Sequence, residues 1–296
     1  MNRPSFLVIG AMKSGTTTLY EDLRSQPGLL VSDKESGILT GQQEGPNNAP
    51  SDDQILRSYD AAFGPARPET LCGEVATTYS MEPHFPGVAQ RAARLFPSSL
   101  KIVYLVRNPI TRIISHHHHD YSSGRLGSDV DTAVRSDPRM LDYSRYATQI
   151  HPWIEAFGPD RVLLVRFESY VADRDLVLQD ILRFLGAPGP LQPVGAEVHN
   201  ASTGKRVATG MWGKIARSPI YRRAIRPIIP QGFKRRAMTR VLPQAPDRPT
   251  PPAVSTLDYM RQELEDDMAA FSRLIGEDWW GATPPTRGTH TPLGLT

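Results

Sequence analysis

The stretch Phe6-Leu-Val-Ile-Gly10-Ala-Met-Lys13-Ser-Gly15-Thr-Thr-Thr18 decides the fold of this chain. It starts with a short, continuous apolar run, which is typical of a strand buried on both faces. A turn containing two glycines follows, and Leu19 and Leu23 then recur at the spacing of one helix face. The order of strand, glycine-containing turn and helix predicts a P-loop-like unit.

Four more apolar runs of the same kind follow along the chain, and helical patterns separate them. The five predicted strands are Phe6–Ile9, Leu29–Val31, Leu71–Val75, Ile102–Val106 and Val162–Phe167. The main predicted helices are Thr17–Ser25, Val88–Phe96, Pro109–Ser122, Tyr143–Phe157, Leu176–Leu185 and Ser255–Ile275. This alternation favours one α/β domain over residues 1–296, with a central parallel sheet flanked by helices.

The turn after the first strand is suited to an anion. Backbone N–H groups, the positive end of the helix dipole and the Lys13 ammonium would all point toward one bound phosphate-like group. We expect it to be held by Lys13, Ser14, Gly15, Thr16, Thr17 and Thr18. Lys13 precedes Gly15, whereas the lysine of a nucleoside-triphosphate P-loop follows its second glycine. The site is therefore expected to work without a metal.

A second anion site is expected after the strand at 102–106. Asn108 is a good N-cap and Pro109 a good first helical residue. Arg107 would then stand at the carboxyl edge of the sheet, where open parallel sheets bind their ligands. Ser115 would lie about two turns into the following helix. Arg107 and Ser115 together are predicted to hold a second phosphate.

The charge of the chain is unevenly distributed. The net charge of the 296 residues is only +3. Between Gly204 and Arg248, however, the sequence has twelve lysines and arginines and a single acid, Asp247. We interpret residues 204–250 as a basic helical insertion, or lid, within the domain. Such a tract predicts contact with an anionic partner or a membrane surface.

Other features narrow the class of protein. The single cysteine, Cys72, excludes an intramolecular disulfide and is expected to be a small buried hydrophobe. No apolar run is long enough to span a membrane, so we expect a soluble, cytoplasmic protein. The run His116-His-His-His119-Asp120 lacks a second ligand cluster, and we expect a solvated or cleft-lining helix face there rather than a metal site.

Taken together, the two loops resemble those of the sulfotransferases that use 3′-phosphoadenosine 5′-phosphosulfate (PAPS). The resemblance covers most of residues 5–200 and the last helix with Trp279-Trp280. It implies that the loop at Lys13 holds the 5′-phosphosulfate and that Arg107 and Ser115 hold the 3′-phosphate. It also implies a basic loop over the nucleotide, for which the counterpart is Gly204-Lys205-Arg206.

The resemblance is to the branch that sulfates sugar hydroxyls, because that branch carries a glutamate soon after the first helix. It implies Glu35 as the general base, with Lys13 as the other catalytic residue. The branch often has a lysine where this chain has Val75. Further residues could line the acceptor pocket: Glu74, Tyr79, His84 and Tyr143. The acceptor would be a hydroxyl of a carbohydrate, a glycolipid or a secondary metabolite.

Two other classes of function remain open from the sequence. A nucleotide-dependent kinase would need Mg²⁺ and an acid at the end of a core strand, where this chain has Arg107. A non-enzymatic binder of polyanions or membrane surfaces would depend on the basic tract alone, with affinity that falls steeply with salt. We expect no nucleic-acid partner.

Overall fold

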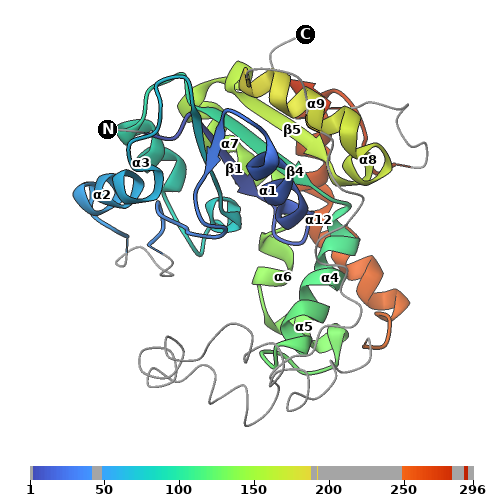
Figure 1. Ribbon diagram of the computed structural model, residues 1–296. Helices are drawn as coiled ribbons and strands as arrows, with labels where there is room; N and C mark the ends of the chain where they lie inside the picture. Colours follow the sequence, from blue (N-terminus) through green and yellow to red (C-terminus); the bar gives the residue numbers. More distant parts are fainter. Residues whose placement is uncertain (1–2, 42–48, 188–191, 193–248, 282–289, 293–296) are drawn as a thin grey trace, which may run out of the picture.

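The protein is described by a computed structural model. The description covers residues 3–41, 49–187, 192 and 249–281, together with the backbone of residues 290–292 (Figure 1). The basic tract and the predicted nucleotide loop Gly204-Lys205-Arg206 lie outside the described residues.

A six-stranded sheet forms the centre of the fold (Figure 1). Its strands are β1 Phe6–Gly10, β2 Leu29–Val31, β3 Leu71–Val75, β4 Lys101–Val106, β5 Val162–Arg166 and β6 His290–Pro292. They lie in the order β2-β3-β1-β4-β5-β6. The first five strands are mutually parallel, and β6 pairs antiparallel with β5. The predicted parallel sheet of five strands is thus confirmed, and β6 was not predicted.

The six predicted helices are all present, with bounds shifted by a few residues. They are α1 Thr16–Ser25, α3 Val88–Leu95, α4 Pro109–Ser122, α7 Tyr146–Phe157, α9 Arg174–Leu185 and α12 Val254–Ile275. Within the described residues, four helices were not predicted: α2 Asp52–Phe63, α5 Val130–Ser136, α6 Arg139–Asp142 and α8 Phe167–Ala172. Two 3₁₀ turns, Thr77–Ser80 and Pro159–Arg161, complete the described elements.

Helix α2 begins with a local start signal. Ser51 and Gln54 form a capping box, in which each side chain bonds the backbone of the other residue. The buried residues Ile55, Tyr59 and Phe63 follow at a spacing of four, which is one helix face. The residues around these positions are mostly polar, so the composition of the segment indicates a loop and the helical pattern is easily missed.

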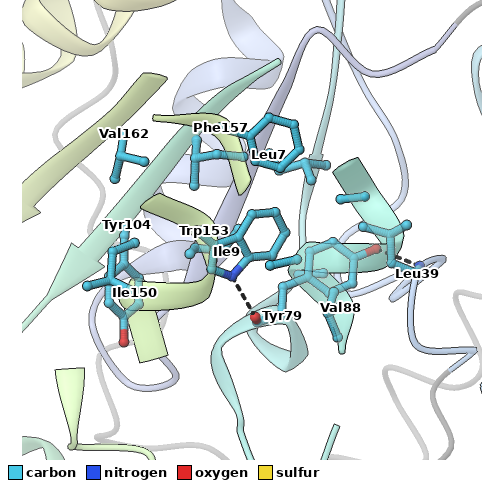
Figure 2. Close-up of a cluster of buried hydrophobic side chains, with 14 of the residues drawn as sticks. Leu7, Ile9, Leu39, Tyr79, Val88, Tyr104, Ile150, Trp153, Phe157 and Val162 are labelled. Carbon is cyan, nitrogen blue, oxygen red and sulfur yellow. Dashed lines mark hydrogen bonds between the residues drawn. The ribbon is translucent and has the colours of Figure 1, made fainter. Parts of the chain in front are cut away.

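Both faces of the sheet are covered, which explains why its strands are continuously apolar. Leu7, Ile9 and Tyr104 face a core that includes Trp153 of α7 (Figure 2). In that core, the Trp153 indole N–H donates to the Tyr79 carbonyl oxygen at 3.3 Å. The alternate strand residues face a second core, covered by α1 and α9. Cys72 is buried as expected.

No described helix combines the length and the apolar character that crossing a bilayer requires. Because β1 to β5 are parallel, their carboxyl ends meet at one edge of the sheet. Lys13, Ser14, Gly15, Glu35 and Arg107 lie in the loops that leave β1, β2 and β4 there. Thr16, Thr17 and Thr18 form the first turn of α1, and Ser115 lies further along α4. Helices α4, α5 and α6 contact one another beyond this edge (Figure 1).

Candidate active site

The loop from β1 to α1 leaves the start of the helix open to an anion. Gly15 is the N-cap of α1, in the left-handed conformation with φ of 85°, and no side chain caps the helix. The first amide groups of a helix have no intrahelical acceptor. An anion at this position would therefore accept hydrogen bonds that the protein itself does not satisfy.

The predicted residues of this loop divide by exposure. Lys13, Gly15 and Thr17 are partly accessible, whereas the side chains of Ser14, Thr16 and Thr18 are buried. Lys13 itself has a positive φ of 71°, an uncommon conformation for a residue with a Cβ atom. Bent in this way, the loop would contact an anion through backbone groups, Lys13 and Thr17.

Gly15 is required by both conformation and space. A Cβ atom at this position would lie 2.8 Å from the Phe167 ring. We therefore expect Gly15→Ala to displace the loop and to weaken binding of adenosine 3′,5′-bisphosphate by at least about tenfold, measured by calorimetry. Gly127→Ala is the matched control, because nothing lies within 4 Å of a Cβ atom there. Equal affinity in the two variants would contradict this role of Gly15.

The second predicted anion loop lies directly beside the first. The Asn108 side chain caps α4 by accepting a hydrogen bond from the Thr111 N–H at 3.1 Å, and Pro109 begins the helix, as predicted. The Arg107 guanidinium donates to Thr111 Oγ1 at 3.0 Å and to the Lys13 carbonyl oxygen at 3.4 Å. Ser115 is half-buried on α4. The structure therefore joins the loops of β1 and β4 through Arg107.

Two aromatic residues that were not predicted as site residues, Phe167 and Tyr146, contact these loops. The Phe167 ring lies next to Gly15, and the Arg107 guanidinium stacks over it at 5.1 Å from the ring centre. The Tyr146 hydroxyl donates to the Arg107 carbonyl oxygen at 2.8 Å. Burial lowers the pKa of Arg107, but a guanidinium remains charged at neutral pH.

Glu35 lies at the same edge of the sheet, in the loop after β2, and its side chain is 36% exposed. Its carboxylate accepts hydrogen bonds from the Thr77 N–H at 2.9 Å and the Thr77 hydroxyl at 3.0 Å. Lys34 Nζ donates to the other carboxylate oxygen at 3.1 Å. Glu35 also has a positive φ, 55°. Among the described residues other than glycine, only Lys13 and Glu35 have this backbone conformation.

The residues predicted to line an acceptor pocket are mostly closed to solvent. Glu74, Tyr79 and Tyr143 are buried, and only His84 is half-buried. The first two bond each other, with 2.6 Å between the Tyr79 hydroxyl and the Glu74 carboxylate. Val75, at the position where the resemblance suggested a lysine, is fully buried in the core beneath α1.

We expected a solvated or cleft-lining histidine face on α4, but two of the four histidines are buried. His116 is buried, stacks on Tyr143 and bonds the buried Arg112 side chain. His117 is also buried, and its ring bonds the Gly127 carbonyl oxygen at 3.0 Å. Four histidines in a row span more than one turn, so they cannot all share one face.

The His119 side chain is exposed to solvent, and the positive charge of Lys13 acts on it electrostatically. Desolvation by the surrounding chain and the positive charge of Lys13 lower the pKa of His119 to about 4. The imidazole is therefore neutral at physiological pH. His119 follows Ser115 by four residues, so both side chains lie on the same face of α4. The sequence contains this spacing of four residues, but the run of four histidines does not single out His119.

The fold and site define a P-loop-like α/β protein in which a hydrogen bond joins the loops that follow β1 and β4 at the carboxyl edge of the sheet. Residues 3–205 match the family model described as the sulfotransferase domain. The chain belongs to the sulfotransferase family, which confirms the resemblance drawn from Lys13, Arg107 and Ser115 at the level of the family.

Several relatives are similar to this chain at low identity. Carbohydrate sulfotransferase 15 of Mus musculus is 23% identical over 249 residues, covering 64% of this chain and 44% of the relative. Heparan sulfate glucosamine 3-O-sulfotransferase 3B1 of the same species is 25% identical over 198 residues, covering 62% and 46%. The chain thus matches less than half of the length of these relatives.

One solved structure supports the fold. A sulfotransferase from Alicyclobacillus acidocaldarius superposes with a TM-score of 0.63 at 20% identity, covering 94% of this chain and 98% of that one.

Proposed function

We propose that the protein transfers the sulfuryl group of PAPS to a hydroxyl of a carbohydrate, with Glu35 as general base. The observation that carries the proposal is the hydrogen bond from Arg107 to the Lys13 carbonyl oxygen. It joins two loops suited to anions at one edge of the sheet. Glu35, a partly exposed carboxylate, lies at that same edge. A nucleotide with phosphates at two positions needs such a pair of sites.

The donor groups present fit this nucleotide. The uncapped start of α1 and the Lys13 ammonium suit the 5′-phosphosulfate. Arg107 presents a planar guanidinium, which suits the 3′-phosphate, and Ser115 is the hydroxyl that would accompany it. The Phe167 ring and the Tyr146 hydroxyl contact Arg107 and support its position. The predicted third group, Gly204-Lys205-Arg206, remains a prediction.

In the proposed reaction, an acceptor oxygen forms a bond to sulfur while the bond from sulfur to the bridging phosphate oxygen breaks. Glu35 takes the proton of the acceptor hydroxyl, which makes the oxygen a better nucleophile. Lys13 and the first amides of α1 stabilise the negative charge that develops on the departing phosphate. The protein otherwise contributes alignment of the two reactants.

The carbohydrate acceptor is supported by the loop that carries Glu35 and by the names of the relatives. Both mouse relatives are named as enzymes that act on carbohydrate or heparan sulfate. A glycolipid or the hydroxyl of a secondary metabolite presents the same reacting group. Contact of the basic tract with an anionic acceptor or a membrane remains a prediction from the sequence.

The kinase alternative is less well supported by the described residues. Its metal would need a free acid at the end of a core strand. The acid near the end of β3, Glu74, already accepts four hydrogen bonds from protein groups. The residue that follows β4 is Arg107.

The donor nucleotide can be tested by thermal unfolding with adenosine 3′,5′-bisphosphate. We expect at least several degrees of stabilisation at saturating nucleotide, equal with and without Mg²⁺, because ligand binding to the folded state raises its stability. Arg107→Ala should lose most of this shift. Arg57→Ala, which removes an exposed arginine on α2, should keep it. Absence of any shift in the wild-type protein would overturn the proposed function.

A further inference from the structure

The strand next to β1 carries a buried carboxylate whose role in the site was not evident from the sequence. Glu74 in β3 is 0% exposed. One carboxylate oxygen accepts hydrogen bonds from the Ser36 hydroxyl at 2.5 Å and the Ile38 N–H at 3.1 Å. The other accepts from the Tyr79 hydroxyl at 2.6 Å and from the Tyr59 hydroxyl.

These contacts fill the hydrogen-bonding capacity of the group. An ionised carboxylate offers about four acceptor positions, and here four donors occupy them. All four are neutral groups rather than cations. A buried polar group is tolerated when it is hydrogen-bonded in this way, and a hydrogen bond inside a protein is electrostatically stronger than one in water. Glu74 therefore binds its partners firmly, and two of those partners lie in the loop of Glu35.

The segment from Glu74 to Tyr79 holds that loop at both ends. At its start, the Glu35 N–H donates to the Val75 carbonyl oxygen at 3.1 Å. The Glu35 side chain is held by Thr77. At its end, the Leu39 N–H donates to the Tyr79 hydroxyl at 2.9 Å, and that same hydroxyl bonds Glu74. The bonds of Glu74 to Ser36 and Ile38 lie between these two ends.

This anchoring explains the backbone of Glu35. A residue with a Cβ atom is rarely found at positive φ, and such a conformation persists where the surrounding contacts fix it. Residues of this kind concentrate at active sites. Glu35 adopts a φ of 55° immediately before the segment that Glu74 holds.

We infer that Glu74 is a positioning residue for Glu35: its buried carboxylate fixes the loop at Ser36 and Ile38 and thereby directs the Glu35 carboxylate toward the acceptor. The inference rests on the proposed function, because it assigns Glu74 a task only if Glu35 is the base. It predicts that the loop loosens, and that catalysis slows, when the bonds between Glu74 and the loop are removed.

The first test is Ser36→Ala, which removes one loop donor and leaves both carboxylates in place. With adenosine 3′,5′-bisphosphate bound, hydrogen exchange at the Glu35, Ile38 and Leu39 amides should rise about tenfold or more. In turnover of PAPS with desulfated heparin as acceptor, kcat should fall about tenfold while KM for PAPS stays unchanged. Ser99→Ala, at an exposed serine, is the matched control.

Two further variants separate positioning from general stability. Glu74→Gln places an amide NH₂ among four donors and should increase loop exchange more than Ser36→Ala does. Tyr59→Phe removes a donor on α2, which bonds the Glu74 oxygen that Ser36 and Ile38 do not use. It should lower the unfolding temperature but keep kcat within about twofold, because the bonds from Glu74 to Ser36 and Ile38 remain.

The outcomes distinguish this inference from the proposed function. The inference alone would be overturned if Glu35→Gln is inactive while Ser36→Ala and Glu74→Gln keep the wild-type loop exchange and kcat. Full activity of Glu35→Gln would overturn the proposed base and the inference with it. Loop exchange and kcat that change together, with unchanged affinity for adenosine 3′,5′-bisphosphate, would support both.

Discussion

The Glu35→Gln variant is expected to lose about 10²–10⁴-fold in kcat and to bind adenosine 3′,5′-bisphosphate as the wild type does. A glutamine has the size and shape of the glutamate, and its carbonyl oxygen can still accept the two hydrogen bonds from Thr77. Its amide nitrogen cannot take a proton from a hydroxyl. The substitution thus removes the base with little change in the loop.

The measurement is the release of adenosine 3′,5′-bisphosphate from PAPS, with desulfated heparin as acceptor, together with calorimetry of nucleotide binding. Glu69→Gln provides the same chemical change at an exposed position in the loop before β3, and it should be fully active. If Glu35→Gln keeps more than about half of the wild-type kcat, Glu35 is not the base. If it loses nucleotide affinity as well, the substitution has disturbed the nucleotide site.

The parts of the fold that could be predicted from sequence are those set by local patterns. Continuous apolar runs identified β1 to β5, because strands covered on both faces need no polar side. Asn108 and Pro109 identified the start of α4, because an N-cap residue and a proline at the first helical position are local signals. Strand β6 has only three residues and pairs with β5 over a sequence distance of more than a hundred, so no local pattern indicates it.

The candidate site shows the same division. Lys13 and Arg107 could be selected because each follows a predicted strand, and parallel strands end at one edge. Glu35 was selected through the resemblance to sulfotransferases. The residues that hold them could not be selected in this way. Phe167 contacts Gly15 and Arg107 only because β5 lies beside β4. The contact of Glu74 with Ser36 depends on β3 lying between β1 and β2.

Lys13→Ala is expected to reduce kcat by about 10²–10³-fold, the effect of losing one group that stabilises charge in the transition state. Alanine also carries a Cβ atom, so the positive φ of this residue is no more strained after the substitution than before. The change therefore removes the ammonium while the backbone of the loop, including the start of α1, can keep its place. Affinity for adenosine 3′,5′-bisphosphate should fall less than kcat, because Arg107 remains.

The same variant has a second readout that needs no acceptor. The positive charge of Lys13 helps to lower the pKa of His119 to about 4, so its removal should raise that pKa toward the ordinary value near 6.5. The His119 ring protons, assigned with His119→Gln, report this by NMR titration. Lys101→Ala is the control, because Lys101 begins β4 at the opposite edge of the sheet. If Lys13→Ala leaves the His119 titration unchanged, the Lys13 ammonium does not lie close to His119 on α4.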